Sequence, residues 1–315
     1  MINLVVSEKY QVSSDTVCIV LTDPDGDLLP PFTAGAHVDI ELGEGLTRQY
    51  SLWNSSHERH RYCLGVALVA DSRGGSRAVH DLQLGMSVAV SAPRNLFPLV
   101  EAEHITLVAC GIGITPILAM ADELHRGGKS FTLHYRLRSV EGGAFVDYLQ
   151  STAYANHVVF HPSDAMPTAS FDFSTLLATD ARDRRIYVCG PAGFTDALRE
   201  AAVKAGVHET HFHQELFAAE KTILERDDTF VVHFSQSGVT TTVPPGVSVA
   251  EAARAAGVAL PTSCGQGICG TCLVNVLAGV PDHRDDYLTP SERDANNQML
   301  TCCSRSKTKE LTLDL

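Results

Sequence analysis

Short runs in which apolar and polar residues alternate fill the first hundred residues of the chain. In residues 38–42, for example, apolar side chains alternate with acidic ones, and Gly and Pro separate such runs from one another. Alternation with a period of two predicts β-strands that bury one face, and a series of short strands predicts an antiparallel barrel. Residues 74–76 (Gly-Gly-Ser) interrupt the pattern and are expected to open a short helix over residues 77–84, whose amino end can bind an anion.

The pattern changes after the first hundred residues, where continuous apolar runs alternate with amphipathic segments. This predicts strands that alternate with helices, and hence a doubly wound parallel sheet. Such a sheet binds its ligands beyond the carboxyl ends of its strands. We expect strands at residues 105–109, 131–135 and 186–188, and helices at residues 116–125 and 192–205.

A polar and highly charged stretch at residues 218–228 is expected to be a linker. Beyond it, the pattern predicts strands at 230–234 and 239–243 and a helix at 249–256. The chain is therefore expected to be multidomain. The modules are an antiparallel β-barrel over residues 1–100, an α/β domain over residues 101–217 and a compact α+β domain over residues 229–315.

The chain is acidic, with a formal net charge of −13 over 315 residues. This argues against nucleic-acid binding, because neutralising phosphates requires a basic surface. No run of eighteen apolar residues occurs, and the amino terminus lacks the charged and then apolar pattern of a signal peptide. We therefore expect a cytoplasmic protein with no membrane or nucleic-acid partner.

The cysteines are distributed unevenly, since five of the nine lie between residues 264 and 303. That distribution favours metal ligation over a disulfide framework. Cys264, Cys269 and Cys272 are separated by four and two residues, and Cys302 follows after a further 29, which is the spacing of plant-type [2Fe-2S] sites. The intervening glycines leave room for two irons and let backbone N–H groups point at sulfur.

Two alternatives concern the same cysteines. A structural zinc site is one, although zinc favours paired knuckles that each supply two ligands. The other is that Cys303 replaces its neighbour Cys302 as the fourth ligand. We expect Cys302 to be the ligand and Cys303 to be a buried structural thiol.

A second motif lies on an expected strand of the barrel, Arg48-Gln49-Tyr50-Ser51. The Tyr50 ring can pack flat against an isoalloxazine, the Ser51 hydroxyl can donate a hydrogen bond toward flavin N5, and the Arg48 guanidinium can neutralise a phosphate. Gly75 and Ser76, at the start of the expected helix, can hold the same phosphate. The alternative is that Tyr50 and Arg48 are an ordinary half-buried and an ordinary solvated residue.

A third motif, Gly111-Ile-Gly113-Ile-Thr115-Pro116, follows an apolar strand and precedes a helix. We expect Thr115 to be the N-cap and Pro116 to be the first helical residue. The motif lacks the third glycine of the dinucleotide fingerprint, so it indicates a nucleotide site only together with other features.

One such feature is Cys189-Gly190-Pro191, which ends another strand of the same expected sheet. Cys189 is then placed beside a nicotinamide ring, where a small polarisable thiol can approach closely; the alternative is an ordinary buried cysteine. Arg136 and Arg138 follow a neighbouring strand, where a 2′-phosphate would lie, and leave NADH against NADPH open.

Taken together, these motifs and their order resemble the phthalate dioxygenase reductase family of the ferredoxin-NADP reductase superfamily, which includes the vanillate demethylase reductases. The resemblance covers essentially the whole chain and implies a β-grasp ferredoxin fold for residues 229–315. It implies FMN rather than FAD. Phe194 departs from the family pattern, which more often has an aliphatic residue or Met after Cys-Gly-Pro. The implied flavin contacts are Arg48, Gln49, Tyr50, Ser51, Val66, Ala67, Leu68, Gly74, Gly75, Ser76 and Phe217.

The resemblance also implies a nicotinamide-nucleotide site, with Ser51 and Cys189 as catalytic residues. NADH would reduce FMN, FMN would pass single electrons to the cluster, and the cluster would deliver them to a terminal Rieske non-haem iron oxygenase component. A redox sensor and a self-contained flavin oxidoreductase are the alternatives. The residues implied at the nucleotide are Gly111, Gly113, Thr115, Pro116, Arg138, Cys189, Gly190 and Pro191.

Overall fold

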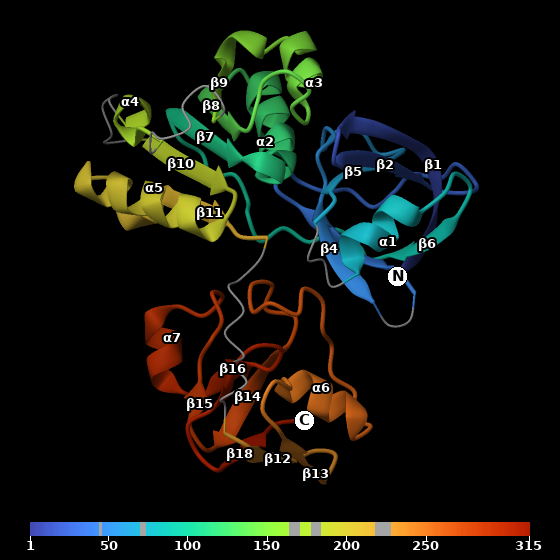
Figure 1. The fold of residues 1–315 in the computed structure, drawn as a ribbon, viewed down its shortest axis with the longest axis vertical. Helices are drawn as coiled ribbons and strands as arrows, with labels where there is room; N and C mark the ends of the chain where they lie inside the picture. The colour runs from blue at the N-terminus through green and yellow to red at the C-terminus, as the bar shows by residue number, and fades with distance from the viewer. Residues whose placement is uncertain (44–45, 70–73, 164–170, 178–183, 218–227) are drawn as a thin grey trace. The chain divides into compact units, whose positions relative to one another are not determined.

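The computed structural model describes residues 1–43, 46–69, 74–163, 171–177, 184–217 and 228–315. They belong to two compact units, Met1–Phe217 and Ala218–Leu315 (Figure 1). The predicted linker at residues 218–228 lies outside the described residues except for Asp228. No helix among the described residues is long and apolar enough to cross a membrane.

The first unit begins with a six-stranded antiparallel sheet in the order β4-β3-β6-β1-β2-β5. A bridge between Leu52, just after β4, and Leu64 in β5 joins the two ends of this sheet, which confirms the predicted barrel. Ile19 and Leu64 belong to the barrel core, whereas Val20 faces a second core that includes helix α2 (Ile114–Arg126). The strands are β1 (Ile2–Ser13), β2 (Thr16–Thr22), β3 (His37–Glu41), β4 (Thr47–Ser51), β5 (Tyr62–Ala67) and β6 (Ser87–Val90).

Helix α1 (Gly75–Asp81) starts earlier and ends earlier than the expected helix over residues 77–84. It starts after Gly74, whose φ of 89° lies in the left-handed region that glycine adopts readily. It ends because Leu82 takes an extended backbone conformation, with ψ of 138°.

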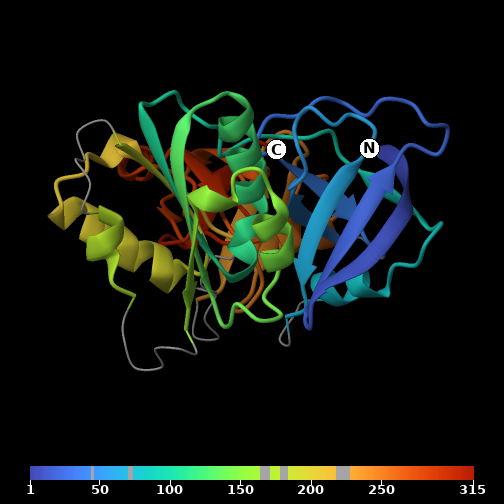
Figure 2. The same cartoon turned by 90° about the horizontal axis from the view of Figure 1, so that it is seen from above.

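The first unit continues with a parallel sheet in the order β11-β10-β7-β8-β9, which confirms the predicted α/β domain. Leu107 and Leu133 pack in one core with α2, whereas Ile186 and Val188 pack with α5 in another. The two helices therefore cover opposite faces of the sheet, as Figure 2 shows. The elements are β7 (His104–Cys110), η1 (Gly111–Gly113), α2 (Ile114–Arg126), β8 (Ser130–Leu137), α3 (Val146–Ser151), η2 (Ala155–His157), β9 (Val158–Pro162), α4 (Phe173–Leu177), β10 (Arg184–Cys189), α5 (Ala192–Lys204), η3 (Glu209–His211) and β11 (Phe212–Glu215).

The start of α2 differs from the prediction. A 3₁₀ turn over Gly111–Gly113 runs directly into the helix, so α2 begins at Ile114 and its N-cap is Gly113. Thr115 is thus inside the first turn, where its hydroxyl donates to the carbonyl of Ile112 at 3.2 Å. Pro116 is the third helical residue, a position at which its missing N–H leaves no intrahelical bond unmade.

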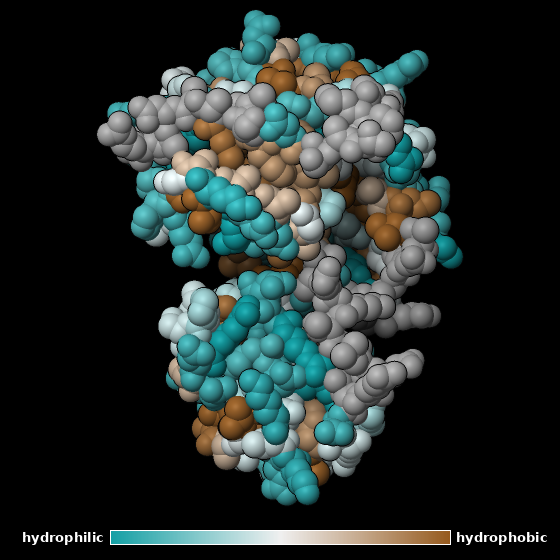
Figure 3. Space-filling model, turned by 60° about the vertical axis from the view of Figure 1, so that its left-hand side comes forward, coloured by the Kyte–Doolittle hydropathy of each residue, from teal (hydrophilic) through white to brown (hydrophobic). Residues whose placement is uncertain are grey.

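The second unit is a mixed sheet in the order β13-β12-β18-β14-β16, with only β12 and β18 parallel. Helix α6 begins with a reciprocal capping box between Ser248 and Glu251 and packs Val249 and Ala253 on this sheet. This arrangement confirms the predicted β-grasp fold. On the face drawn in Figure 3, polar residues predominate on this unit. Its elements are β12 (Phe230–Phe234), β13 (Val239–Val243), α6 (Val249–Ala255), β14 (Leu273–Ala278), β15 (Pro281–Asp282), α7 (Pro290–Ala295), β16 (Gln298–Leu300), β17 (Arg305–Ser306) and β18 (Glu310–Leu313).

Candidate cofactor sites

The edge strand β4 carries four of the residues expected to bind flavin. The strand alternation divides them, so that Arg48 and Tyr50 share one face and Gln49 and Ser51 share the other. Arg48 extends over Gly75, where an ideal Cβ would lie 2.5 Å from Cγ of the arginine. Because glycine leaves that space open, a guanidinium group and the first turn of α1 come together at this edge of the barrel.

Helix α1 is tied to the end of β5 by its side chains. The Ser76 hydroxyl accepts a hydrogen bond from the N–H of Val69 at 3.2 Å, and a ring nitrogen of His80 lies 2.9 Å from the carbonyl oxygen of Val66. These contacts bring the amino end of α1 beside the end of β5. The residues expected along the flavin ring, Val66, Ala67 and Leu68, lie at that end of β5 and directly after it.

The other face of β4 meets the α/β domain. The Ser51 hydroxyl, on a buried residue, donates a hydrogen bond to a carboxylate oxygen of Glu215 at 3.5 Å. Glu215 ends β11 and lies directly opposite the fully buried Cys189, which ends β10. Ser51 and Cys189, placed in different domains by the sequence, therefore converge on one acidic side chain.

Glu215 was absent from the residues expected at the site. Its sequence signal was present, because Glu215 comes two residues before Phe217 at the carboxyl end of a strand, where ligands bind in such sheets. Burial raises the pKa of Glu215 to about 8, and the hydrogen bond from Ser51 opposes part of this rise. Burial also raises the pKa of the Cys189 thiol well above its usual value, so this thiol is neutral.

The raised pKa of Glu215 predicts a specific pH dependence of stability. Because ionisation is easier in the unfolded chain, which has the ordinary glutamate pKa, stability should fall as pH rises from about 4.5 to about 8. A Glu215→Gln variant lacks this contribution. We expect its melting temperature, relative to that of the wild type, to rise across this interval. The exposed Glu103→Gln variant is the control for loss of charge; a constant difference for Glu215→Gln would contradict the prediction.

Two loops at the carboxyl ends of β7 and β10 are in backbone contact. An ideal Cβ at Gly113 would lie 2.2 Å from the carbonyl oxygen of Cys189, and one at Gly190 would lie 2.7 Å from Cβ of Cys110. Real Cβ atoms do not approach other heavy atoms this closely, so both positions require glycine. Pro191 is the N-cap of α5, and the two motifs thus form one continuous surface at the end of the sheet.

Other residues that the sequence analysis singled out lie elsewhere in the first unit. Arg138 is exposed just beyond β8. Its neighbour Arg136 donates weakly to the carbonyls of His161 and Pro162 at 3.4 and 3.3 Å. Phe194, the departure from the family pattern, packs against Phe171 and Phe173. Phe217 is 36% exposed and ends the first unit.

In the second unit the four expected cysteine ligands gather. All four are buried, and side-chain contacts join Cys264 to both Cys269 and Cys302, and Cys302 to Cys272. The N–H of Gln266 donates to the sulfur of Cys264 at 3.3 Å, and that of Gly267 donates to the sulfur of Cys302 at 3.2 Å. Backbone N–H groups therefore point at sulfur, as the glycine-rich sequence predicts.

The glycines of this loop also make space. A Cβ at Gly267 would lie 2.5 Å from the sulfur of Cys303, and a Cβ at Gly270 would lie 2.4 Å from the ring of Tyr287. The Cys303 sulfur lies 3.8 Å from the carbonyl oxygen of Leu300, a weak contact. Four thiols with N–H donors fit an iron-sulfur cluster by their chemistry, because such clusters are held by Cys thiolates whose sulfurs accept hydrogen bonds.

Comparison with known proteins gives matches along the whole chain. Residues 232–307 match the family of 2Fe-2S iron-sulfur cluster binding domains. The chain is 44% identical to a vanillate O-demethylase oxidoreductase of Pseudomonas sp. (strain HR199 / DSM 7063), with 100% of both chains covered. It is 39% identical to a phthalate dioxygenase reductase of Burkholderia cepacia, covering 100% of this chain and 97% of the relative.

A solved structure agrees with these matches. It is described as phthalate dioxygenase reductase, a modular structure for electron transfer from pyridine nucleotides to [2Fe-2S]. It superposes on this chain with a TM-score of 0.81 and 38% identity, covering 100% of this chain and 98% of the other. The domain types and their order are therefore shared over the full length.

Proposed function

Since this chain belongs to the phthalate dioxygenase reductase family, we propose that it is the NADH-dependent reductase component of an aromatic oxygenase. The observation that carries the proposal is the convergence of Ser51 with Cys189 and Glu215 in the first unit. A barrel edge and the carboxyl ends of a parallel sheet meet there, which suits hydride transfer from a nicotinamide to a flavin. The four gathered cysteines of the second unit would hold the cluster that passes the electrons to the oxygenase.

The flavin site is assigned to residues 1–100. The Arg48 guanidinium and the backbone of Gly74, Gly75 and Ser76 would hold the phosphate of FMN. The buried amide nitrogen of Gln49 has no hydrogen-bond partner among the described residues and is a donor available to the flavin. Along the ring we assign Tyr50, Val66, Ala67 and Leu68, with Phe217 near its face.

The nucleotide site is assigned to residues 101–217. Gly111, Gly113 and the start of α2 would hold NADH against Cys189 and Gly190, with Thr115, Pro116, Arg138 and Pro191 around it. Bound FMN supplies the conversion of a two-electron hydride into single electrons, and a [2Fe-2S] cluster accepts them one at a time. A neutral Cys189 thiol and a protonated Glu215 would place no negative charge where the hydride arrives, and the Ser51 hydroxyl would turn from Glu215 to hydrogen-bond the flavin edge.

The cluster is assigned to Cys264, Cys269, Cys272 and Cys302 in residues 229–315. The match of residues 232–307 to 2Fe-2S domains favours it over structural zinc. We propose that the cluster delivers electrons to a terminal Rieske non-haem iron oxygenase that hydroxylates or demethylates an aromatic acid. The names of the relatives, a vanillate O-demethylase oxidoreductase and a phthalate dioxygenase reductase, support an aromatic oxygenase as the partner.

A direct assay tests the proposed function. Purified protein that holds flavin and cluster should reduce the one-electron acceptor cytochrome c when NADH is supplied. The proposal is wrong if the loaded protein shows no such activity. Phosphodiesterase treatment of the released flavin separates FMN, which resists cleavage, from FAD, which yields FMN.

A further inference from the structure

A buried carboxylate in the second unit lies outside the cysteine ligands and the proposed electron path. Asp285, in the segment between β15 and α7, is 2% exposed. One of its carboxylate oxygens accepts a hydrogen bond from the N–H of Leu288 at 2.8 Å, and the other accepts one from the hydroxyl of Ser304 at 3.2 Å. A buried carboxylate needs such donors, because burying its charge without them is strongly unfavourable.

Asp285 connects the two segments that carry the expected cluster ligands. Ser304 lies two residues after Cys302, and its hydroxyl reaches the Asp285 carboxylate. On the other side, an ideal Cβ at Gly267 would lie 3.0 Å from Cα of Asp285, and the N–H of Asp286 donates to the Gly267 carbonyl at 3.0 Å. Asp285 therefore packs against Gly267, the residue whose N–H donates to the sulfur of Cys302.

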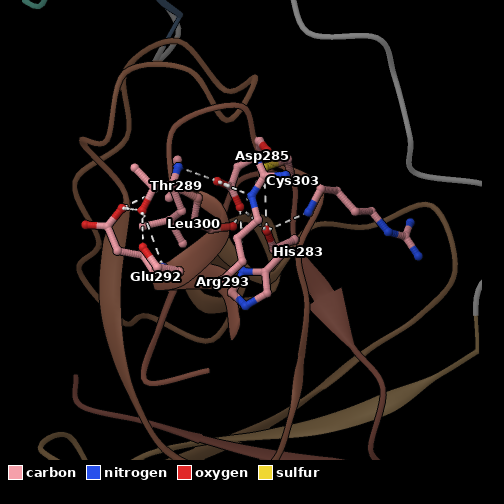
Figure 4. A network of polar contacts seen from close by, with 11 residues as sticks. His283, Asp285, Thr289, Glu292, Arg293, Leu300 and Cys303 are labelled. Atoms are coloured by element: carbon pink, nitrogen blue, oxygen red, sulfur yellow. Dashed lines mark hydrogen bonds and ion pairs between the residues drawn. The ribbon is translucent and has the colours of Figure 1, made fainter. Parts of the chain in front are cut away.

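Two basic side chains lie near the carboxylate but beyond hydrogen-bond distance from its oxygens. Nδ1 of His283 lies 3.7 Å from one carboxylate oxygen, and Nε of Arg293 lies 3.9 Å from the other (Figure 4). The guanidinium of Arg293 also donates to the Asp285 backbone carbonyl. The distances of 3.7 and 3.9 Å to the carboxylate oxygens are longer than those of ordinary charge-assisted hydrogen bonds. The negative charge is therefore only partly balanced within the network.

Charge and hydrogen bonds near the sulfurs set the reduction potential of an iron-sulfur cluster. Reduction adds one negative charge, which a nearby buried carboxylate disfavours, and the interaction is strong where water is excluded. From this geometry we propose that Asp285 is a positioning residue of the cluster. It ties the 264–272 loop to the 302–304 turn, and its charge lowers the cluster's reduction potential. The inference rests on the cluster site proposed above.

The test is a redox titration of the full-length loaded protein, followed by the EPR signal of the reduced cluster. Asp285→Asn keeps the size of the side chain and removes its charge, so the midpoint potential should rise. A tenfold shift of the oxidised-to-reduced equilibrium corresponds to about 59 mV for one electron, and we expect a shift of up to this size. Asp314→Asn is the matched control, because Asp314 accepts its hydrogen bond from Gln236 at the end of the sheet; its potential should be unchanged.

An Asp285→Asn potential equal to that of the wild type overturns the inference. If that variant does not fold, Ser304→Ala replaces it, because it keeps the charge and removes the hydroxyl that donates to Asp285 and accepts the N–H of Arg284. Loss of this hydroxyl should loosen the hydrogen bond from the Gly267 N–H to the Cys302 sulfur and thereby lower the midpoint potential. An unchanged midpoint potential in Ser304→Ala would also overturn the inference. Absence of a cluster signal in the wild type would instead contradict the proposed function, so the two failures are distinguishable.

Discussion

A Cys302→Ser variant is expected to lose electron delivery to the acceptor while NADH still reduces its flavin. Cys302 contacts both Cys264 and Cys272 and accepts the N–H of Gly267. Removing its thiolate takes away one of the four proposed ligands, and cysteine thiolates are what hold such clusters. The residues that we propose for flavin reduction belong to the first unit. Stopped-flow absorbance at the flavin band and the rate of cytochrome c reduction measure the two activities independently.

The neighbouring thiol provides the matched control. Cys303→Ser should keep the cluster and most of the cytochrome c activity, because serine keeps the size of the side chain and its hydroxyl can replace the contacts of the Cys303 sulfur with Leu300, Ser304 and Cys302. If Cys303→Ser lost the cluster and Cys302→Ser kept it, the assignment of the fourth ligand would be reversed. Loss of both activities in Cys302→Ser would mean that the cluster-bearing unit also supports the flavin site.

Replacing Gly113 with alanine is expected to lower the rate of flavin reduction by NADH about a hundredfold. The new Cβ would lie 2.2 Å from the carbonyl oxygen of Cys189, an atom of the backbone that no rotamer change can move away. The two loops must therefore separate, and a displacement of about 1 Å at a reacting centre can cost on the order of a hundredfold in rate. Flavin content should be unchanged, because the residues that we propose to bind the flavin lie in the barrel, with the exception of Phe217.

Gly193→Ala is the control for the same chemical change in the same domain. Gly193 lies in the first turn of α5, and an added Cβ there would meet no atom within 4 Å. Alanine is also the better helix former, by roughly 1 kcal/mol. Equal rates for Gly113→Ala and wild type, measured under single-turnover conditions, would show that the contact between the loops does not position the nucleotide.

The periodic patterns were sufficient to predict the barrel, the parallel sheet and a compact α+β unit, whereas the β-grasp fold of that unit was implied by the family resemblance. The apolar runs of β7 and β10 reflect burial on two faces, which local sequence records directly. In β3 the alternation predicted the strand but not its burial, because Asp39 is buried as well and pairs with Arg94. The start of α2 was predicted wrongly. Thr-Pro is a typical helix-start sequence, but the 3₁₀ turn over Gly111–Gly113 continues into the helix and moves the start to Ile114.

Glu215 and Asp285 were missed for a different reason. Their importance arises from contacts between segments distant in sequence, Ser51 with Glu215 and Ser304 with Asp285. No local spacing encodes such pairs. The cysteine motif and the Arg-Gln-Tyr-Ser strand, in contrast, place several groups on one loop or one strand, and their spacing is visible in the sequence itself.

The central claim is that one chain divides the electron pair of a hydride and passes single electrons to a cluster. Anaerobic titration of the loaded protein with NADH, followed by flavin absorbance and EPR at low temperature, tests it most directly. We predict uptake of more than two electrons per chain, with the signal of a reduced [2Fe-2S] cluster appearing as the flavin bleaches. Uptake that stops at two electrons, with a bleached flavin and an EPR-silent cluster, would contradict the account.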